Sequence, residues 1–212
     1  MLLAALAMQG CVRLHVAAPE IRDYRLDYSA PKIDGTPVPV VLRIAPLSVA
    51  AIYDRQAIVY RDGPYSTGTY FDSRWSASPG SMVSDLLARD FADSALYRDV
   101  QEGPSIAAAD YLLTGMVEDI EERATDRSCS GHLRLRVAVT RLQPGANSVV
   151  LQKSYDADEP TTCGQPTAVA RAISQDLAKI SAELQADVNR ALSVAAAATA
   201  GGGSARAPRP GG

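Results

Sequence analysis

The sequence contains little of the material from which most catalytic and nucleic-acid-binding sites are built. Its 212 residues include two His and one Trp, and no apolar run approaches the roughly 20 residues that a membrane-spanning helix needs. The net charge of −3 comes without a basic cluster, and nucleic acid requires a concentrated cationic face. With 47% hydrophobic and 21% charged residues, the chain has the composition of an ordinary globular protein. We expect no nucleic-acid partner.

Motifs for catalysis are missing as well. The sequence has no Gly-x-Ser-x-Gly, no phosphate-binding loop, no dinucleotide fingerprint and no haem motif. His15 lies in a segment expected to be a tether, and His132 lies on the expected exposed face of a strand, so neither is placed as a general base. The acidic pairs at 118–119 and 121–122 are interpreted as a solvated strand end. We therefore expect no enzyme activity, no cofactor and no metal.

What the sequence does contain begins at its N-terminus. A short apolar run, residues 2–8, leads through Gln9 and Gly10 to Cys11, which is typical of a bacterial lipoprotein signal. On this interpretation residues 1–10 are a signal peptide, Cys11 carries the acyl chains, palmitate among them, and 11–23 are a tether. Val12 is not the Asp that retains lipoproteins in the inner membrane, which favours the periplasmic face of the outer membrane. Because no Lys or Arg precedes the run, a cytosolic start with a buried free Cys11 is the alternative.

The periodicity of the remaining sequence predicts a folded domain over residues 24–194. Alternation and turn signals predict strands, and apolar stripes at spacings of three and four predict two helices. The predicted strands are 38–44, 58–60, 67–71, 97–100, 110–122, 133–139 and 149–155, and the predicted helices are 78–96 and 166–193. Residues 195–212 are rich in Ala, Gly and Pro and are expected to be a disordered tail.

Two further cysteines flank a predicted hairpin centred near residue 146. In an antiparallel ladder paired positions sum to a constant, and this centre places Cys129 opposite Cys163. A disulfide there would stabilise the fold by roughly 3–4 kcal/mol. Two alternatives are two free thiols, and a zinc site that adds His132 and either Asp126 or Asp158 to the cysteines.

Several segments resemble one known family in their order along the chain. Residues 40–46, Val-Val-Leu-Arg-Ile-Ala-Pro, are followed by Tyr-Asp-Arg-Gln-Ala-Ile-Val at 53–59 and Tyr-Phe-Asp-Ser-Arg-Trp at 70–75. The amphipathic segment 81–96 and Asp-Tyr-Leu-Leu-Thr-Gly at 110–115 come next. Over residues 24–193 the chain is similar to the ABC-type transport auxiliary lipoproteins. Residues 76–80 depart from the family pattern, so the loop there is expected to differ.

The resemblance implies an α/β (α+β) fold, a mixed and largely antiparallel sheet with two main helices on one face. It also implies a non-enzymatic accessory role beside an MCE-type ABC lipid transport system. The lipoprotein would dock the transporter's MCE-domain protein at the outer membrane, and a ring or dimer of the chain would suit a symmetric partner. The alternative is an outer-membrane assembly or structural lipoprotein that serves no transporter.

The family-like segments supply the candidate partner-binding residues. These are Asp54, Arg55, Gln56, Tyr70, Arg74 and Trp75. In one interpretation they form a surface region in which Trp75 and Tyr70 anchor the partner. In the other, Trp75 packs the sheet against the helix at 81–96, and Arg55 pairs with a carboxylate to fix a loop.

Overall fold

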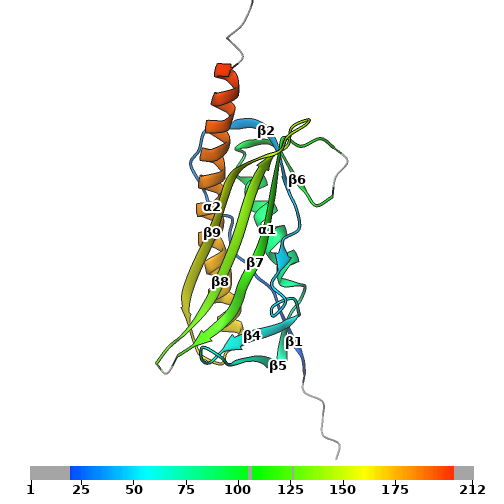
Figure 1. The fold of residues 1–212 in the computed structure, drawn as a ribbon. Helices are drawn as coiled ribbons and strands as arrows, with labels where there is room; N and C mark the ends of the chain where they lie inside the picture. The colour runs from blue at the N-terminus through cyan, green and yellow to red at the C-terminus, as the bar shows by residue number, and fades with distance from the viewer. Residues whose placement is uncertain (1–19, 105–106, 126, 203–212) are drawn as a thin grey trace, which may run out of the picture.

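A computed structural model describes residues 20–104, 107–125 and 127–202 (Figure 1). This part of the chain forms nine strands and two helices. The strands are β1 (Arg22–Tyr24), β2 (Val38–Ile44), β3 (Ser48–Val49), β4 (Ala57–Arg61), β5 (Thr67–Trp75), β6 (Tyr97–Glu102), β7 (Tyr111–Ala124), β8 (Cys129–Arg141) and β9 (Ser148–Thr161), and the helices are α1 (Pro79–Asp93) and α2 (Pro166–Gly202). Neither helix, as far as the structure describes it, is long and apolar enough to cross a bilayer.

All of these strands join one mixed sheet organised around β7. On one side of β7, β8 and then β9 continue an antiparallel ladder. Along the other side lie β2, β3 and β4 in succession, each parallel to β7. β6 extends the sheet beyond β2, and β5 and β1 extend it beyond β4. Both helices cover the same face of the sheet (Figure 1), so the mixed α/β architecture with two main helices on one face is confirmed.

The core lies between the long ladder and α2. The stripe predicted for α2 is buried at spacings of three and four, and the alternate residues of β8 face it. The fully buried members are Val169, Ile173, Leu177, Leu184, Val188 and Leu192 on α2, with Leu133, Leu135 and Val139 on β8. At Gly131 the helix comes so close that a Cβ atom would lie 2.8 Å from the Cβ atom of Ala172. A glycine is needed there because backbone and helix meet.

The helix α1 begins as its sequence predicts and is tied to α2 by a buried carboxylate. Ser78 is the N-cap and accepts a hydrogen bond from the Ser81 N–H, and Pro79 occupies the first turn. Asp90 accepts hydrogen bonds from the hydroxyls of Tyr28 and Ser181, both at 2.6 Å, although it is 1% exposed. Asp90 therefore links three parts of the fold: α1, α2 and the segment that precedes β2.

Two boundaries differ from the sequence-based expectation. In the β8–β9 hairpin Cys129 lies opposite Thr161 rather than Cys163, because the hairpin is centred about one residue earlier than expected. The helix α2 also continues beyond residue 194, so residues 195–202 are helical where a disordered tail was expected. That stretch begins with alanines, which have the highest helix propensity, and they extend an existing helix without a new nucleation step. Cys11 and residues 203–212 lie outside the described residues.

Candidate functional site

The residues predicted to bind a partner do not form one surface. Asp54, Arg55 and Gln56 lie in the turn between β3 and β4, and all three are exposed. The turn is held by backbone hydrogen bonds, among them one of 2.7 Å from the Trp75 N–H to the Gln56 carbonyl. Trp75 itself is 1% exposed. It is a core residue, so its predicted role as an interface anchor is wrong.

The other two predicted residues make contacts within the fold. Tyr70 donates its hydroxyl hydrogen to Glu122, and burial together with this carboxylate raises the pKa of Tyr70. Arg74 lies 2.7 Å from Asp23 through its Nε atom and joins β5 to β1 at the surface. Both side chains thus have structural partners, and only the turn at 54–56 presents its predicted residues entirely to solvent.

Beneath that turn lies a buried cluster of charges on the face of the sheet opposite the helices. Glu121 of β7 is 0% exposed, which contradicts the expectation that the acidic strand end would be solvated. Its carboxylate accepts a 2.5 Å hydrogen bond from the Tyr53 hydroxyl and lies 3.0 Å from both Arg61 and Arg123. The Tyr53 side chain, carried by the same turn, covers Glu121 from solvent. The acid is buried because two guanidinium groups and a hydroxyl replace its water.

His132 continues this cluster on β8 and is also 0% exposed, not solvent-facing as predicted. Its Nδ1 atom lies 3.0 Å from Asp158 and 3.7 Å from Asp156, and its Nε2 atom lies 3.5 Å from Asp119. His132, Asp156 and Asp158 are close enough to offer three atoms to one cation. However, the Nε atom of Arg134 lies 2.5 Å from Oδ2 of Asp156, so a basic side chain of the protein already compensates the charge of this carboxylate. The cluster is chemically an ion-pair network.

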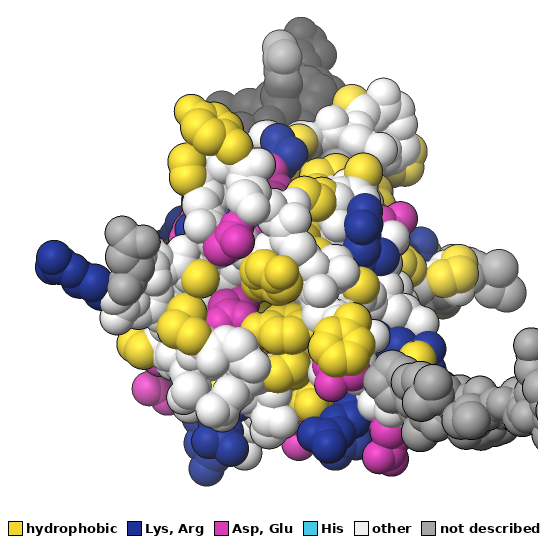
Figure 2. Space-filling view, turned by 90° about the horizontal axis from the view of Figure 1, so that it is seen from below, with side chains coloured by type: hydrophobic (Ala, Val, Ile, Leu, Met, Phe, Trp, Pro, Cys, Tyr) yellow, Lys and Arg dark blue, Asp and Glu magenta, His cyan; other side chains and the backbone are white. Residues whose placement is uncertain are grey.

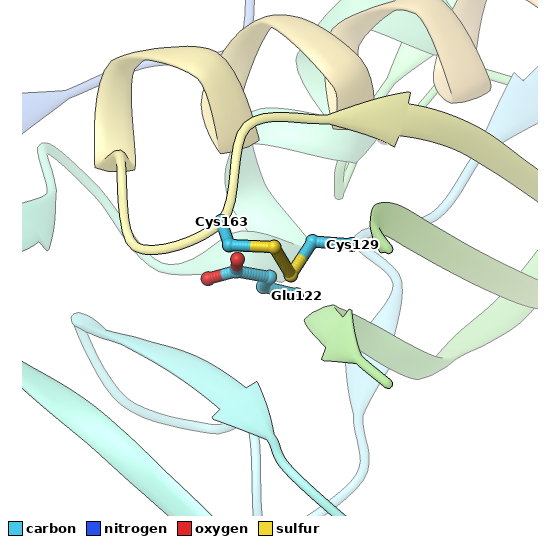
Figure 3. Close-up of side chains that lie close together, drawn as sticks. All are labelled: Glu122, Cys129 and Cys163. Atoms are coloured by element: carbon cyan, nitrogen blue, oxygen red, sulfur yellow. A yellow bond between two sulfur atoms is a disulfide. The ribbon is translucent and has the colours of Figure 1, made fainter. Parts of the chain in front are cut away.

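At the lower end of the sheet the structure joins Cys129 and Cys163 in a disulfide with a Cα–Cα distance of 5.2 Å (Figure 3). Since Cys163 follows β9, the bond is made by the turn that leads into α2. Gly164 has a φ of +67°, which a glycine adopts without strain, and its N–H donates a 3.0 Å hydrogen bond to Glu122. With its thiols bonded to each other, this pair is not a set of zinc ligands.

Glu122 and the disulfide line one side of an apolar cleft of about 370 Å³. Tyr60, Tyr70 and Phe71 form the wall on the side of β4 and β5. Glu122 is 2% exposed, and its oxygens are occupied by the Tyr70 hydroxyl and the Gly164 N–H. The cleft therefore offers apolar surface rather than a reactive carboxylate.

One buried acid has no such partners. Asp176 of α2 is 0% exposed, and neither carboxylate oxygen accepts a hydrogen bond from any described residue. Desolvation, followed by the nearby charges of Asp158 and Asp156, raises the pKa of Asp176 to about 8. At neutral pH this side chain is therefore mainly protonated inside the helix–sheet interface.

The sequence profile of the ABC-type transport auxiliary lipoprotein component matches residues 24–185, three quarters of the chain. The chain belongs to this family. The match includes the exposed turn, the charge cluster and the disulfide, and ends within α2.

Solved structures share the fold of this auxiliary lipoprotein. Protein XCC0632 from Xanthomonas campestris is 24% identical, with 82% of this chain and 93% of that chain covered and a TM-score of 0.68. The hypothetical protein CT253 from Chlamydia trachomatis is 10% identical, with 73% and 98% covered and a TM-score of 0.55. No curated protein matches the sequence significantly.

Sequence reasoning missed the buried acids of this auxiliary lipoprotein for two different reasons. Asp176 lies three residues after Ile173 and four before Ile180, within the apolar stripe of α2, so its burial could have been predicted from helical spacing. Glu121 and His132 carry no such signal. They lie on the polar side of their strands, and Tyr53, which contacts Glu121, is more than 60 residues away in the sequence.

Proposed function

We propose that this protein is a non-enzymatic, lipid-anchored accessory component of an MCE-type ABC lipid transport system, and that it docks the transporter's periplasmic part at the outer membrane. The observation that carries the proposal is the family match over residues 24–185, preceded in the same chain by the apolar run and Cys11. Such a role needs a membrane anchor and a binding surface rather than a reaction: the acyl chains hold the protein at a membrane, and a surface of the folded domain binds the transporter.

The chemistry of the described polar residues supports a role without catalysis. Glu121 is neutralised by Arg61 and Arg123, and His132 lies among carboxylates that also meet Arg134. Glu122 is occupied by hydrogen-bond donors. These groups stabilise the fold from within, and Glu121, Glu122 and His132 are at most 2% exposed, whereas a general acid or base must come within hydrogen-bond reach of its substrate.

The anchor is tested first. Palmitate labelling in the native host should mark the wild-type chain and leave Cys11→Ser unlabelled, because only the thiol at position 11 is expected to receive diacylglycerol. Intact mass measurement should give a protein that begins at Cys11 and carries acyl chains. A native chain that retains residues 1–10 with an unmodified Cys11 would contradict the proposal.

Docking is tested by co-purification with the MCE-domain protein from solubilised native membranes. We assign the contact to the turn at 54–56, whose charged side chains are exposed. Arg55→Glu should release most of the MCE protein, whereas the control Arg171→Glu, which reverses an exposed charge on α2, should retain it. Retention by both variants would remove the turn from the interface. Failure of the lipidated wild type to retain any MCE protein would instead favour an assembly lipoprotein that serves no transporter.

A further inference from the structure

One end of the molecule carries exposed aromatic and aliphatic side chains that the core does not use. Tyr65 is 99% exposed, Phe71 81% and Ile21 52%. Tyr60 and Tyr70 lie beside Phe71 along the cleft. We call Ile21, Tyr60, Tyr65, Tyr70 and Phe71 the aromatic end face. Figure 2 looks at this end and shows hydrophobic side chains gathered in its middle, with Lys and Arg side chains toward the margin.

The local backbone turns these side chains outward. β4 and β5 are joined by a turn that holds Tyr65, after the Asp-Gly-Pro sequence at 62–64. The β4–β5 ladder is then interrupted: Val59 lies opposite Thr69, but Ala57 lies opposite Arg74. The extra residues of β5 form a bulge that contains Tyr70 and Phe71, and bulges redirect side chains away from the regular sheet surface. The exposure of Phe71 is therefore built into the strand.

The described chain also begins at this end. β1 runs beside β5, with Arg22 opposite Ser73, so Ile21 lies next to the bulge. Figure 1 shows β1, β4 and β5 together at one end and the last turns of α2 at the other. Eight residues separate Cys11 from Glu20, and an extended chain of that length reaches about 30 Å. The helix α2, with 37 residues, is about 55 Å long, which is more than the tether can reach. A lipid on Cys11 therefore holds the aromatic end, and not the opposite end, near the bilayer.

We infer that the aromatic end face rests on the bilayer that holds the acyl chains of Cys11. This inference depends on the proposed function only for the lipid at that cysteine. At the level of the headgroups Phe71 and Tyr65 can bury apolar area while the Tyr65 hydroxyl stays hydrated, which is why aromatic residues collect at membrane interfaces. Arg22 on β1 and Arg127 in the β7–β8 turn are exposed cations that suit anionic headgroups.

Depth-dependent fluorescence quenching tests this contact with the lipidated full chain. Phe71→Trp introduces a reporter at the centre of the face, and Val194→Trp is the matched control, since Val194 is 67% exposed at the far end of α2. Each protein is reconstituted into vesicles of phosphatidylethanolamine and phosphatidylglycerol, with or without phosphatidylcholine brominated near the headgroup. The native Trp75 is 1% exposed and supplies the same background in both variants. We expect roughly twofold quenching of the emission added by Phe71→Trp and none for Val194→Trp.

The outcomes separate this inference from the proposed function. If mass measurement shows acyl chains on Cys11 but the Phe71→Trp emission is not quenched, the face does not meet the bilayer and the inference is wrong, while the anchor stands. If Cys11 carries no lipid, the proposed anchor fails first. If the Phe71→Trp emission is shifted to the blue equally in detergent and in vesicles and is insensitive to bromine, the face is covered by a second copy, which also overturns the inference.

Discussion

The buried carboxylate of Asp176 should make the stability of the protein fall as pH rises. Its pKa is about 8 in the folded state and 3.8 in an unfolded chain, so between these values the folded state binds more protons than the unfolded state. Folding in this range requires a proton to be taken up, and the requirement becomes harder to meet as pH increases. Asp176 therefore lowers the free energy of unfolding progressively above pH 4, until the effect levels off above pH 8.

The size of this effect follows from linkage. One pKa unit corresponds to about 1.4 kcal/mol, so Asp176 should make the protein less stable at pH 8 than at pH 5 by on the order of 4 kcal/mol. Asp176→Asn keeps the shape of the protonated acid and removes the titration. The variant should match the wild type at pH 5 to within about 1 kcal/mol and exceed it at pH 8.

Urea unfolding at pH 5, 6, 7 and 8, followed by the fluorescence of the buried Trp75, measures the difference. Other groups titrate in both proteins, so the quantity to compare is the gap between wild type and variant at each pH. Asp187→Asn on the same helix is the control of opposite sign: burial alone would raise the pKa of Asp187, but hydrogen bonds from Lys153 and Tyr155, with the charges of Lys153 and Arg190, outweigh it and lower the pKa. It should destabilise the protein at every one of these pH values. A gap between wild type and Asp176→Asn that stays constant from pH 5 to pH 8 would refute the reasoning.

Three further variants test the packing around the site. Cys163→Ser removes the disulfide between residues that are 34 positions apart and should lower the free energy of unfolding by about 4 kcal/mol. Reductant should shift the urea midpoint of the wild type but not of the variant. Gly131→Ala places a methyl group against Ala172 and should destabilise by about 1–3 kcal/mol, whereas Gly63→Ala, with open space around it, should be nearly neutral. Asp90→Asn weakens the link between the helices and should lower the free energy of unfolding by about 1–3 kcal/mol, measured by thermal or urea unfolding. A variant as stable as the wild type would show that the link contributes nothing.

Local patterns in the sequence predicted the elements well because each pattern has a local physical cause. Alternation along residues 133–139 arises from one strand face meeting α2, and the stripe of α2 arises from the same contact. The Ser78–Pro79 start of α1 depends on hydrogen bonds within one turn. The register of the hairpin could be predicted only to within about one residue, since it depends on the exact centre of the turn and on an irregularity between Val139 and Thr140. Cys163 still reaches Cys129 because the turn into α2 brings it back.

The burial of the polar residues could not be predicted from the same patterns. Alternation placed His132 on the polar face of its strand, and Glu121 was expected at a solvated strand end, but a polar face is not always exposed to solvent. Here the turn carrying Tyr53 folds over part of that face, and Arg61 approaches from β4. Such cover depends on contacts between segments far apart in the chain. Trp75 shows the converse: its side chain fills the core, and its place in a family-like motif says nothing about exposure.

The disulfide joins the aromatic end of the sheet to the start of α2. Cys129 starts β8, and Cys163 lies between β9 and α2, so the bond fixes the first turn of α2 to the sheet. Glu122 ties the same point to β5 through the Tyr70 hydroxyl, next to Phe71. The surface proposed to rest on the bilayer and the base of α2 are thus held by one set of contacts. Because α2 is a stiff rod that ends at the other side of the molecule, an orientation fixed at the membrane would also set the direction in which α2 points away from the bilayer (Figure 1).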